Sequence, residues 1–301
     1  MSSALDSLIP GRDLLVLKRE ASAYVSSSFH EILTCRFSDG SIRKLLLKRG
    51  VTHAESSHGN HGGVPYEAEI YRLVLEPLDI RNPRLHAAFV DAASGETVIL
   101  IDYIDASVRL SKAEASKLYD AARWIAAFHK ANQNRVELLT GSVQCYGPDY
   151  YSGWMRRAVE FWSEQSPWLG ALQDAWNDLA RELQCDLTIV HGEYYPKNIL
   201  VSGDTIIPID WETTAIAAGE IDVVFLTERW PDQIREACES AYGQARWPEG
   251  APPSFHRRLL LANMYSQLLR LGHKKHLVSE KEAVQRLNIL HNLCRKAGLV
   301  A

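Results

Sequence analysis

The 301-residue sequence lacks the features that mark membrane, secreted or nucleic-acid-binding proteins. The N-terminal segment Met1–Asp6 has neither the basic start nor the apolar run of a secretory signal, and no apolar stretch approaches bilayer-spanning length. Long basic runs are also missing, and the formal net charge is −4. We therefore expect a cytoplasmic protein that binds neither membranes nor nucleic acid.

Cysteine is scarce and its placement excludes several kinds of chemistry. No C-x-x-C pair occurs, and the count is odd. The widely spaced cysteines are Cys35, Cys145, Cys185, Cys238 and Cys294. This pattern is typical of free thiols in a reducing compartment and predicts neither a disulfide framework nor a zinc site.

The composition, with 46% hydrophobic and 23% charged residues, is that of an ordinary folded protein large enough for two modest domains. Short β-prone runs and one helical stretch precede residue 105. They are Ala23–Val25, His30–Arg36, Arg43–Lys48, Pro65–Leu75 (the helix), Leu85–Val90 and Thr97–Ile104. These runs predict a small sheet-rich N-terminal domain over residues 1–104.

Longer helical patterns follow residue 105. They are Lys112–Ala131, Tyr151–Ser163, Ala171–Leu183, Asp232–Tyr242, Ser254–Leu271 and Ser279–Ala297. The last pattern opens with a capping box, in which Ser279 precedes Glu282 by three residues. The expected fold class is α+β, with a larger, mostly helical domain over residues 105–301 and a hinge near Tyr103–Ala106.

One segment in the helical domain has the spacing that phosphoryl transfer from a nucleotide requires. It runs from His191 through Gly192 and Glu193 to Asn198, and Asp210 follows twelve residues later. Protein kinases place H-R-D-x-x-x-x-N and then D-F-G in this order. Glu193 would be the proton acceptor, and Asn198 and Asp210 would be oxygen ligands suited to magnesium.

A hairpin is expected to bring the two metal ligands together. The cluster Ser202-Gly203-Asp204 separates two β-prone runs. If the turn is centred on Gly203, Asn198 lies across from Pro208, and Asp210 lies two residues further along on the same face.

The motifs H-G-E-x-x-x-x-N and I-D-W-E resemble those of the aminoglycoside phosphotransferase family, which has a protein-kinase-like fold of two lobes and includes antibiotic, choline and sugar kinases. The family usually has H-G-D, so Glu193 departs from its pattern. Further similar segments, from about residue 20 to 230, include Lys48, Glu67 in Tyr66-Glu67-Ala68-Glu69, Leu100–Ile104, Phe128-His129 and Gly219-Glu220-Ile221-Asp222.

The resemblance implies a nucleotide site in the N-terminal lobe. Lys48 would steady the phosphates of ATP or GTP, with Glu67 holding the ammonium in place. Backbone groups from Asp102 to Ile104 would contact the adenine edge. The glycine-rich phosphate loop of kinases is missing; Ser27 and Ser28 would replace it, or they form a plain serine-rich hairpin turn.

Several other polar residues are expected to serve structure. His129 and His191 are interpreted as packing and hydrogen-bonding residues, and Asp222 as a helix cap that braces the catalytic loop. The histidine- and glycine-rich stretch 53–63 is interpreted as a flexible connector, because no fixed ligand spacing supports a metal site there.

The sequence therefore predicts a small-molecule kinase that uses magnesium with ATP or GTP and phosphorylates a hydroxyl group. A non-catalytic nucleotide-binding or ligand-sensing relative is the alternative, and a purely structural helical protein is a third interpretation. The acceptor stays open. Acidic residues favour an aminated sugar: Glu212, Glu220, Asp222 and Glu228. Basic residues favour an anion: Arg270, His273, Lys274, Lys275 and His276.

Overall fold

The computed structural model describes residues 14–22, 28–51, 59, 62–78, 80–273 and 278–299. They form two compact units. The first contains the described residues up to 113 except residue 59, together with residues 196–213; the second contains residues 59, 114–195 and 214–299. The boundary predicted between residues 104 and 105 stays a prediction. The predicted strand Ala23–Val25, Ser27 and most of the stretch 53–63 lie outside the described residues.

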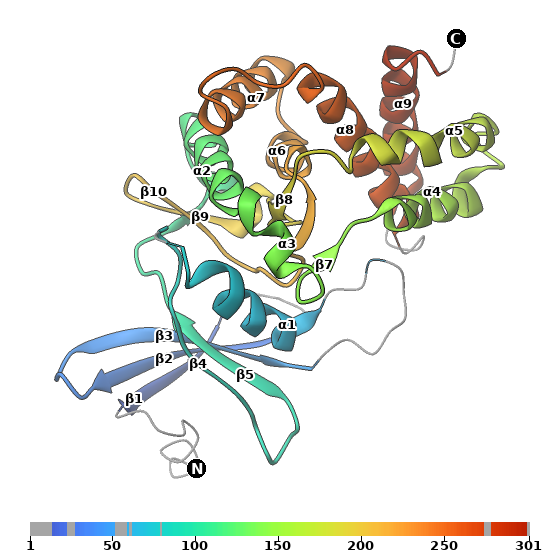
Figure 1. The fold of residues 1–301 in the computed structure, drawn as a ribbon. Helices are drawn as coiled ribbons and strands as arrows, with labels where there is room; N and C mark the ends of the chain where they lie inside the picture. Colours follow the sequence, from blue (N-terminus) through green and yellow to red (C-terminus); the bar gives the residue numbers. More distant parts are fainter. Residues whose placement is uncertain are drawn as a thin grey trace. The chain divides into compact units, whose positions relative to one another are not determined.

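The first unit is built on an antiparallel sheet of order β1-β2-β3-β5-β4 (Figure 1). Its strands are β1 (Leu14–Ala21), β2 (Phe29–Phe37), β3 (Ile42–Gly50), β4 (Leu85–Val90) and β5 (Thr97–Asp102). Strands β2 to β5 coincide with predicted runs. Strand β1 is not predicted, because its sequence turns charged at Lys18-Arg19-Glu20; as an edge strand, it pairs with β2 alone.

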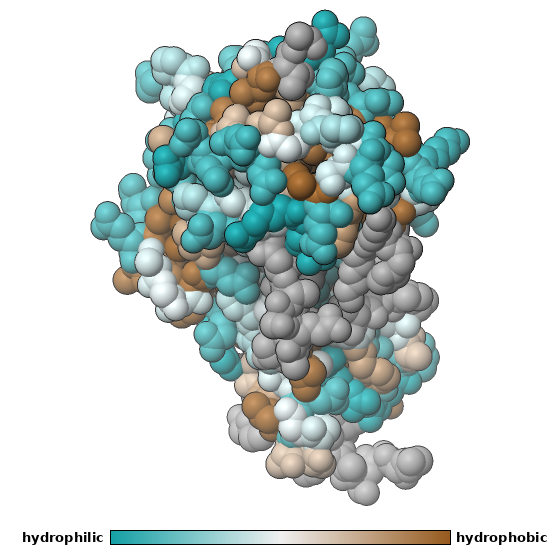
Figure 2. Space-filling view, turned by 90° about the vertical axis from the view of Figure 1, so that its right-hand side faces the viewer, coloured by the Kyte–Doolittle hydropathy of each residue, from teal (hydrophilic) through white to brown (hydrophobic). Residues whose placement is uncertain are grey.

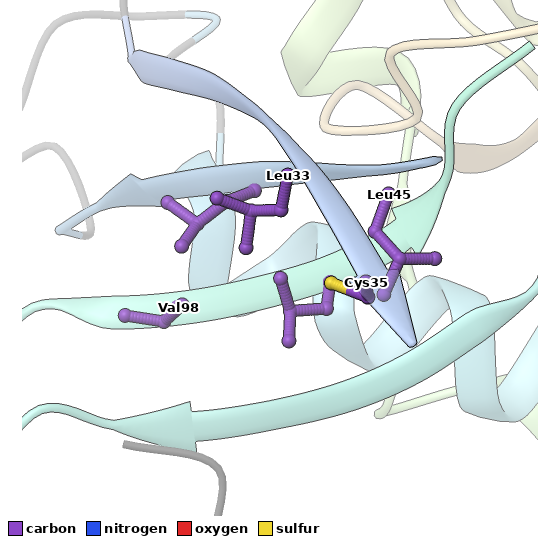
Figure 3. Close-up of a cluster of buried hydrophobic side chains, with 6 residues drawn as sticks. Leu33, Cys35, Leu45 and Val98 are labelled. Carbon is purple, nitrogen blue, oxygen red and sulfur yellow. The ribbon is translucent and has the colours of Figure 1, made fainter. Parts of the chain in front are cut away.

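Strands β2 and β3 form a hairpin whose turn is specified by Asp39 and Gly40. Gly40 has φ of 79°, a conformation that favours glycine, and the Asp39 carboxylate accepts the Ser41 N–H at 2.8 Å. One face of the sheet carries a buried apolar cluster (Figure 3). Its members are Leu33, Cys35, Leu45, Leu47, Val98 and Leu100. Because side chains alternate along a strand, Lys48 points to the opposite face.

Helix α1 (Gly63–Ile70), which continues as a π-helical turn at Tyr71–Leu75, confirms the predicted helix Pro65–Leu75. A second, smaller sheet of the first unit has the order β10-β9-β6. Its strands are β6 (Val108–Arg109), β9 (Ile199–Ser202) and β10 (Thr205–Pro208).

The hairpin of β9 and β10 turns through two residues, Gly203-Asp204, and Gly203 has φ of 57°. The predicted register centres the turn on Gly203 alone and places Asn198 opposite Pro208. This register is wrong by one residue, because Pro208 pairs with Ile199. The physical reason is that hairpins favour two-residue turns whose backbone twist matches that of the strands.

The second unit is mainly helical (Figure 1). Its helices are α2 (Ser116–Asn132), α3 (Val136–Leu139), α4 (Pro148–Trp162), α5 (Trp168–Glu182), α6 (Glu220–Thr227), α7 (Asp232–Arg246), α8 (Phe255–Gly272) and α9 (Glu280–Lys296). Helices α2, α4, α5, α7, α8 and α9 coincide with predicted patterns. The predicted capping box is confirmed, because Ser279 Oγ accepts the Glu282 N–H at 3.2 Å.

A small sheet of order β7-β11-β8 supports the loop at the centre of the second unit. Its strands are β7 (Gln144–Cys145), β8 (Leu187–Val190) and β11 (Ala215–Ala218). Strand β8 leads into the loop 191–195, and β11 leads into α6. Helix α8 packs against α4, α6 and α9, so it is covered on several sides.

Within the described ranges, no helix is long and apolar enough to cross a membrane. On the face drawn in Figure 2, hydrophobic residues appear as separate patches among hydrophilic ones.

Candidate nucleotide and catalytic site

Lys48 lies between two carboxylates in the first unit. Its Nζ is 2.5 Å from Glu67 Oε2 and 2.7 Å from Asp210 Oδ1. The Lys48 and Glu67 side chains are 4% and 1% exposed, whereas that of Asp210 is 33% exposed. Glu67 also accepts the Trp211 N–H through Oε1 at 3.3 Å. The predicted pairing of Lys48 with Glu67 is thus present, and Asp210 joins it.

This arrangement keeps the buried ammonium charged. Burial alone would lower the pKa of Lys48, but the charges of Glu67 and Asp210 raise it above its ordinary value. Breaking a buried pair by removing one partner costs about 3–5 kcal/mol, because the other charge is left uncompensated. Lys48 therefore fixes α1 to β3 and also holds the Asp210 carboxylate at the end of the β9–β10 hairpin.

Asn198 directly precedes β9 and Asp210 follows β10 after one intervening residue, so both lie at that end of the hairpin. Asn198 is 7% exposed, and its carbonyl accepts the Ile209 N–H at 2.9 Å. The next residue, Asp210, has φ of 70°, a left-handed conformation that is uncommon outside glycine and that aspartate tolerates better than most residues. This backbone turn ends the strand alternation, so alternation along the strand does not determine the direction of the Asp210 side chain.

The oxygen donors at this place fit magnesium. An amide and a carboxylate are hard ligands, and magnesium is commonly held by one or two protein oxygens together with phosphate oxygens and water. Among the described residues, no group of three or more His, Cys, Asp or Glu side chains is placed to hold a metal ion. Asn198 and Asp210 are the residues at this end of the hairpin that could hold such an ion.

His30 is a residue near Lys48 that the sequence analysis does not identify. It is the antiparallel partner of Lys48 across β2 and β3, and its Nε2 lies 2.9 Å from Ser28 Oγ. Burial, together with the Lys48 charge, lowers the pKa of His30 to about 4, so its ring is neutral at pH 7. Symmetric pairing centred on Asp39, from which His30 and Lys48 are equally distant in sequence, is the signal that could have revealed it. Of the predicted serines, Ser28 is therefore placed beside Lys48's strand, while Ser27 lies outside the described residues.

The predicted linker residues are not brought together with Lys48 by their side chains. Asp102 ends β5 on the face of the apolar cluster, where its carboxylate accepts the Arg84 N–H at 3.0 Å and lies 2.6 Å from His86 Nε2. Burial would raise the pKa of Asp102, but the hydrogen bond with His86 helps to hold it below its ordinary value. The carbonyl of Ile104 accepts Ser107 Oγ at 3.0 Å. Any contact with a nucleotide from here would come from the backbone.

In the second unit, a buried carboxylate holds the loop that carries Glu193. Asp222 Oδ2 accepts the His191 N–H at 2.7 Å, and Oδ1 accepts the Gly192 N–H at 3.0 Å. Asp222 therefore holds the loop, as predicted. The predicted capping role is wrong, because Asp222 lies inside the first turn of α6, whose N-cap is Gly219. The physical reason is that the carboxylate faces the loop amides instead of the first amides of its own helix.

Asp222 is the end of a buried chain of polar groups. Arg246 Nη1 donates to Tyr242 Oη at 2.5 Å, Tyr242 Oη lies 2.9 Å from His129 Nδ1, and His129 Nε2 lies 3.1 Å from Asp222 Oδ2. Burial lowers the pKa of His129, so it is neutral, and its Nε2–H donates to Asp222. His129 is thus a hydrogen-bonding residue, as the sequence predicts. A Cβ on Gly219 would lie 2.4–2.6 Å from side-chain atoms of Arg246, Tyr242 and His129, so only glycine fits at this position.

Glu193 follows directly on the braced amides and is half-buried. Its N–H donates to His191 Nδ1 at 3.3 Å, and its carbonyl accepts the Tyr195 N–H at 2.6 Å. The His191 ring therefore accepts a backbone amide from the loop. Glu193 belongs to the second unit, whereas Lys48, Glu67, Asn198 and Asp210 belong to the first.

The chain has two features of a kinase-like α+β protein. In its antiparallel sheet, a lysine is held by a helix carboxylate, and in its helical unit, a buried carboxylate binds the amides of the H-G-E loop. The model of the phosphotransferase enzyme family matches residues 30–255, and the chain belongs to this family. No curated protein matches the sequence.

Solved structures share the fold. A choline kinase from Streptococcus pneumoniae is 15% identical, with a TM-score of 0.59, over 93% of this chain and 94% of that one. The aminoglycoside 2′-phosphotransferase IIIa in its GDP complex is 12% identical, with a TM-score of 0.62, over 94% and 93%. An amicoumacin kinase in complex with AMP-PNP and Ca²⁺ is 12% identical, with a TM-score of 0.62, over 96% and 90%. At such identities, the likeness concerns the fold alone.

Proposed function

We propose that the protein is a kinase that transfers the γ-phosphoryl group of ATP or GTP to a hydroxyl of a small molecule. The placement of Lys48 between Glu67 and Asp210 is the observation that carries the proposal, because a buried cation beside a potential magnesium ligand suits the phosphates of a nucleotide. The nucleotides in the GDP and AMP-PNP complexes of structural relatives support it.

The residues have separate roles in this proposal. Lys48, steadied by Glu67, contacts the nucleotide phosphates, and Asn198 and Asp210 hold magnesium, which reduces the charge repulsion between phosphate groups. Ser28, together with Ser27, covers the phosphates, while the backbone from Asp102 to Ile104 contacts the base. Glu193 orients the acceptor hydroxyl and accepts its proton.

Nucleotide consumption in the presence of many candidate hydroxyl acceptors is the direct test. We expect at least one sugar, amino alcohol, hydroxy acid or hydroxylated antibiotic to accelerate ATP or GTP consumption by the wild type. Nucleotide binding without acceptor-stimulated turnover across this screen would favour the non-catalytic nucleotide-binding relative.

Substitutions on strand β3 separate a phosphate-binding lysine from a structural one. Lys48→Ala should weaken nucleotide use by far more than the ~0–1 kcal/mol of a surface ion pair. Lys44→Ala is the matched control, because Lys44 lies on the same strand and face but is 40% exposed and pairs with Asp105. Asp210→Ala should abolish magnesium-dependent turnover in a folded protein; wild-type-like turnover in this variant would refute the kinase proposal.

Glu193 is tested by changing its charge and then its length. Glu193→Gln should lower kcat strongly and leave nucleotide affinity unchanged, since a base acts on the acceptor. Glu193→Asp restores the usual H-G-D. In an active kinase adapted to glutamate, the shorter side chain should reduce activity, because misplacement by about 1 Å can cost on the order of 100-fold. A rate that rises or stays constant would indicate that Glu193 is not the base of an active enzyme.

A further inference from the structure

The acidic residues of the second unit that favour an aminated acceptor already have internal partners. Glu220 Oε1 accepts Arg258 Nε and Nη2 at 3.1 and 2.9 Å, and both side chains are buried. Asp222 is bound to the loop amides. Glu228 accepts Arg286 Nη1 at 2.8 Å. These carboxylates are parts of internal pairs, so they do not form a negative surface that would bind a cation.

Arg270, on α8, is placed differently from its buried neighbours. Its guanidinium carbon lies 4.6 Å from the centre of the Tyr195 ring, and Nη2 is 3.5 Å from Glu228 Oε2. Arg258 and Arg286 each donate several hydrogen bonds to carboxylates. Arg270 Nε, by contrast, is without a hydrogen-bond partner within the described part of the chain, its Nη2 makes the longer ion pair with Glu228, and the side chain is 33% exposed.

The surroundings keep Arg270 charged. Burial alone would lower its pKa, but the neighbouring Tyr195, Glu228 and Glu193 raise it above its ordinary value. Glu193 is two residues from Tyr195, the ring on which the guanidinium lies. A carboxylate suited to act on a hydroxyl and a cation with unused donors therefore lie near each other in one unit.

Two stacked pairs of aromatic rings pack near these charges. Tyr195 stacks on Phe225 at 4.8 Å between ring centres, and Tyr150, on α4, stacks on Tyr146 at 4.0 Å. Tyr150 is half-buried, and Glu193 is among the charges that act on its hydroxyl. Because Tyr195 is 6% and Phe225 is 1% exposed, these two rings fix the position of the guanidinium, whereas the half-buried Tyr150 is a ring that a ligand held by Glu193 could contact.

We propose that Arg270 binds a carboxylate of the acceptor whose hydroxyl is held by Glu193, so that the phosphorylated molecule is a hydroxylated acid and not an amine. The inference rests on the proposed function for the role of Glu193. Arginine suits this task because its planar fork can donate two parallel hydrogen bonds to one carboxylate. An ammonium group at the same place would be repelled by the guanidinium.

Matched sets of small molecules test this preference. Each set contains a hydroxylated acid, its neutral alcohol and its amine. The sets are glycerate, glycerol and 3-amino-1,2-propanediol; gluconate, glucitol and glucamine; and 4-(hydroxymethyl)benzoate, 1,4-benzenedimethanol and 4-(aminomethyl)benzyl alcohol. Binding to the full chain is measured by calorimetry without nucleotide, and acceptor-stimulated ATP consumption is measured in parallel. In at least one set, we expect the acid to bind at least about tenfold more tightly than the amine, as hydrogen bonds to a charged group allow.

Variants assign the preference to the guanidinium. Arg270→Gln should abolish the preference for acids, and Arg270→Lys should retain part of it, because the charge stays while the fork is lost. Arg181→Gln is the control, since that side chain is 71% exposed on α5 and pairs with Asp178 of its own helix. Unfolding curves of each variant check that the fold is kept.

The outcomes separate the inference from the proposed kinase function. Amines that bind as well as acids in every set, an acid preference that survives Arg270→Gln, or the absence of acid binding would overturn the inference, even if a neutral or aminated acceptor stimulates ATP consumption. Acid binding that depends on Arg270 but never stimulates ATP consumption would support the anion site and count against the kinase function.

Discussion

Asp222→Asn isolates the contribution of the carboxylate that holds the Glu193 loop. Asparagine has nearly the same shape, but one of its two terminal groups is an NH2 donor. The better orientation keeps oxygen at the Oδ2 position, where it accepts from His191 N–H and His129 Nε2–H. The amide NH2 then faces the Gly192 N–H, which loses its acceptor.

The magnitude follows from two overlapping costs. A hydrogen bond to a charged acceptor contributes about 1.5–3 kcal/mol, and a buried donor left without a partner costs about 1–3 kcal/mol. Because both costs arise at the Gly192 amide, we expect Asp222→Asn to lower the free energy of unfolding by about 2–4 kcal/mol. Urea unfolding followed by tryptophan fluorescence measures this change.

A surface aspartate supplies the comparison for this measurement. Asp120 is 41% exposed and pairs with Arg123 and Lys117 on α2, so Asp120→Asn should change the unfolding free energy by no more than about 0.5 kcal/mol. If Asp222→Asn unfolds within about 1 kcal/mol of the wild type, the two backbone amides do not depend on the carboxylate, and our account of the loop is refuted.

Two further predictions concern Gly219 and His30. Gly219→Ala places a Cβ 2.4 Å from Arg246 Nη1 and should lower the free energy of unfolding, measured in urea, by at least about 1–3 kcal/mol. Gly170→Ala is the control, because a Cβ there has no atom within 4 Å, and it should not destabilise the protein. Equal stabilities of the two variants would show that Gly219 is not closely packed. Because the pKa of His30 falls from 6.5 to about 4 on folding, the unfolded chain binds more protons between these values, so stability should decrease as pH falls from 6.5 to 4. His30→Gln should flatten this dependence, and an unchanged pH profile in that variant would show that His30 is not its source.

Local patterns predict much of this fold. Apolar periodicity identifies β2 to β5 and most of the long helices, because each buries one face within a short stretch of chain. It fails for β1, whose charged residues Lys18 to Glu20 lie on an edge strand, and for the register of β9 and β10, which depends on whether the turn uses one or two residues. Both features are set by pairing partners and turn geometry, and neither leaves a strong periodic signal.

The candidate site is predictable where it follows the order of the sequence. Lys48 and Glu67 are identified by motif order, and their 2.5 Å contact agrees with it. Whether the acidic residues of the second unit are available to a ligand is not predictable from the sequence, because Glu220 pairs with Arg258 across 38 residues and Glu228 with Arg286 across 58. A count of acidic residues in the sequence treats such carboxylates as available to bind a ligand, whereas in the structure they are paired with buried arginines.

The loop before Asn198 is held by its main chain. The amides of His191 and Gly192 are bound by Asp222, the amide of Glu193 by the His191 ring, and the amide of Tyr195 by the carbonyl of residue 193. None of these bonds uses the side chain at position 193. Substitutions at this position therefore change the reach of a functional group and leave these main-chain bonds in place. Under the proposed function, comparing Asp, Glu and longer synthetic carboxylates at position 193 would therefore measure the distance between the main chain of the loop and the acceptor hydroxyl.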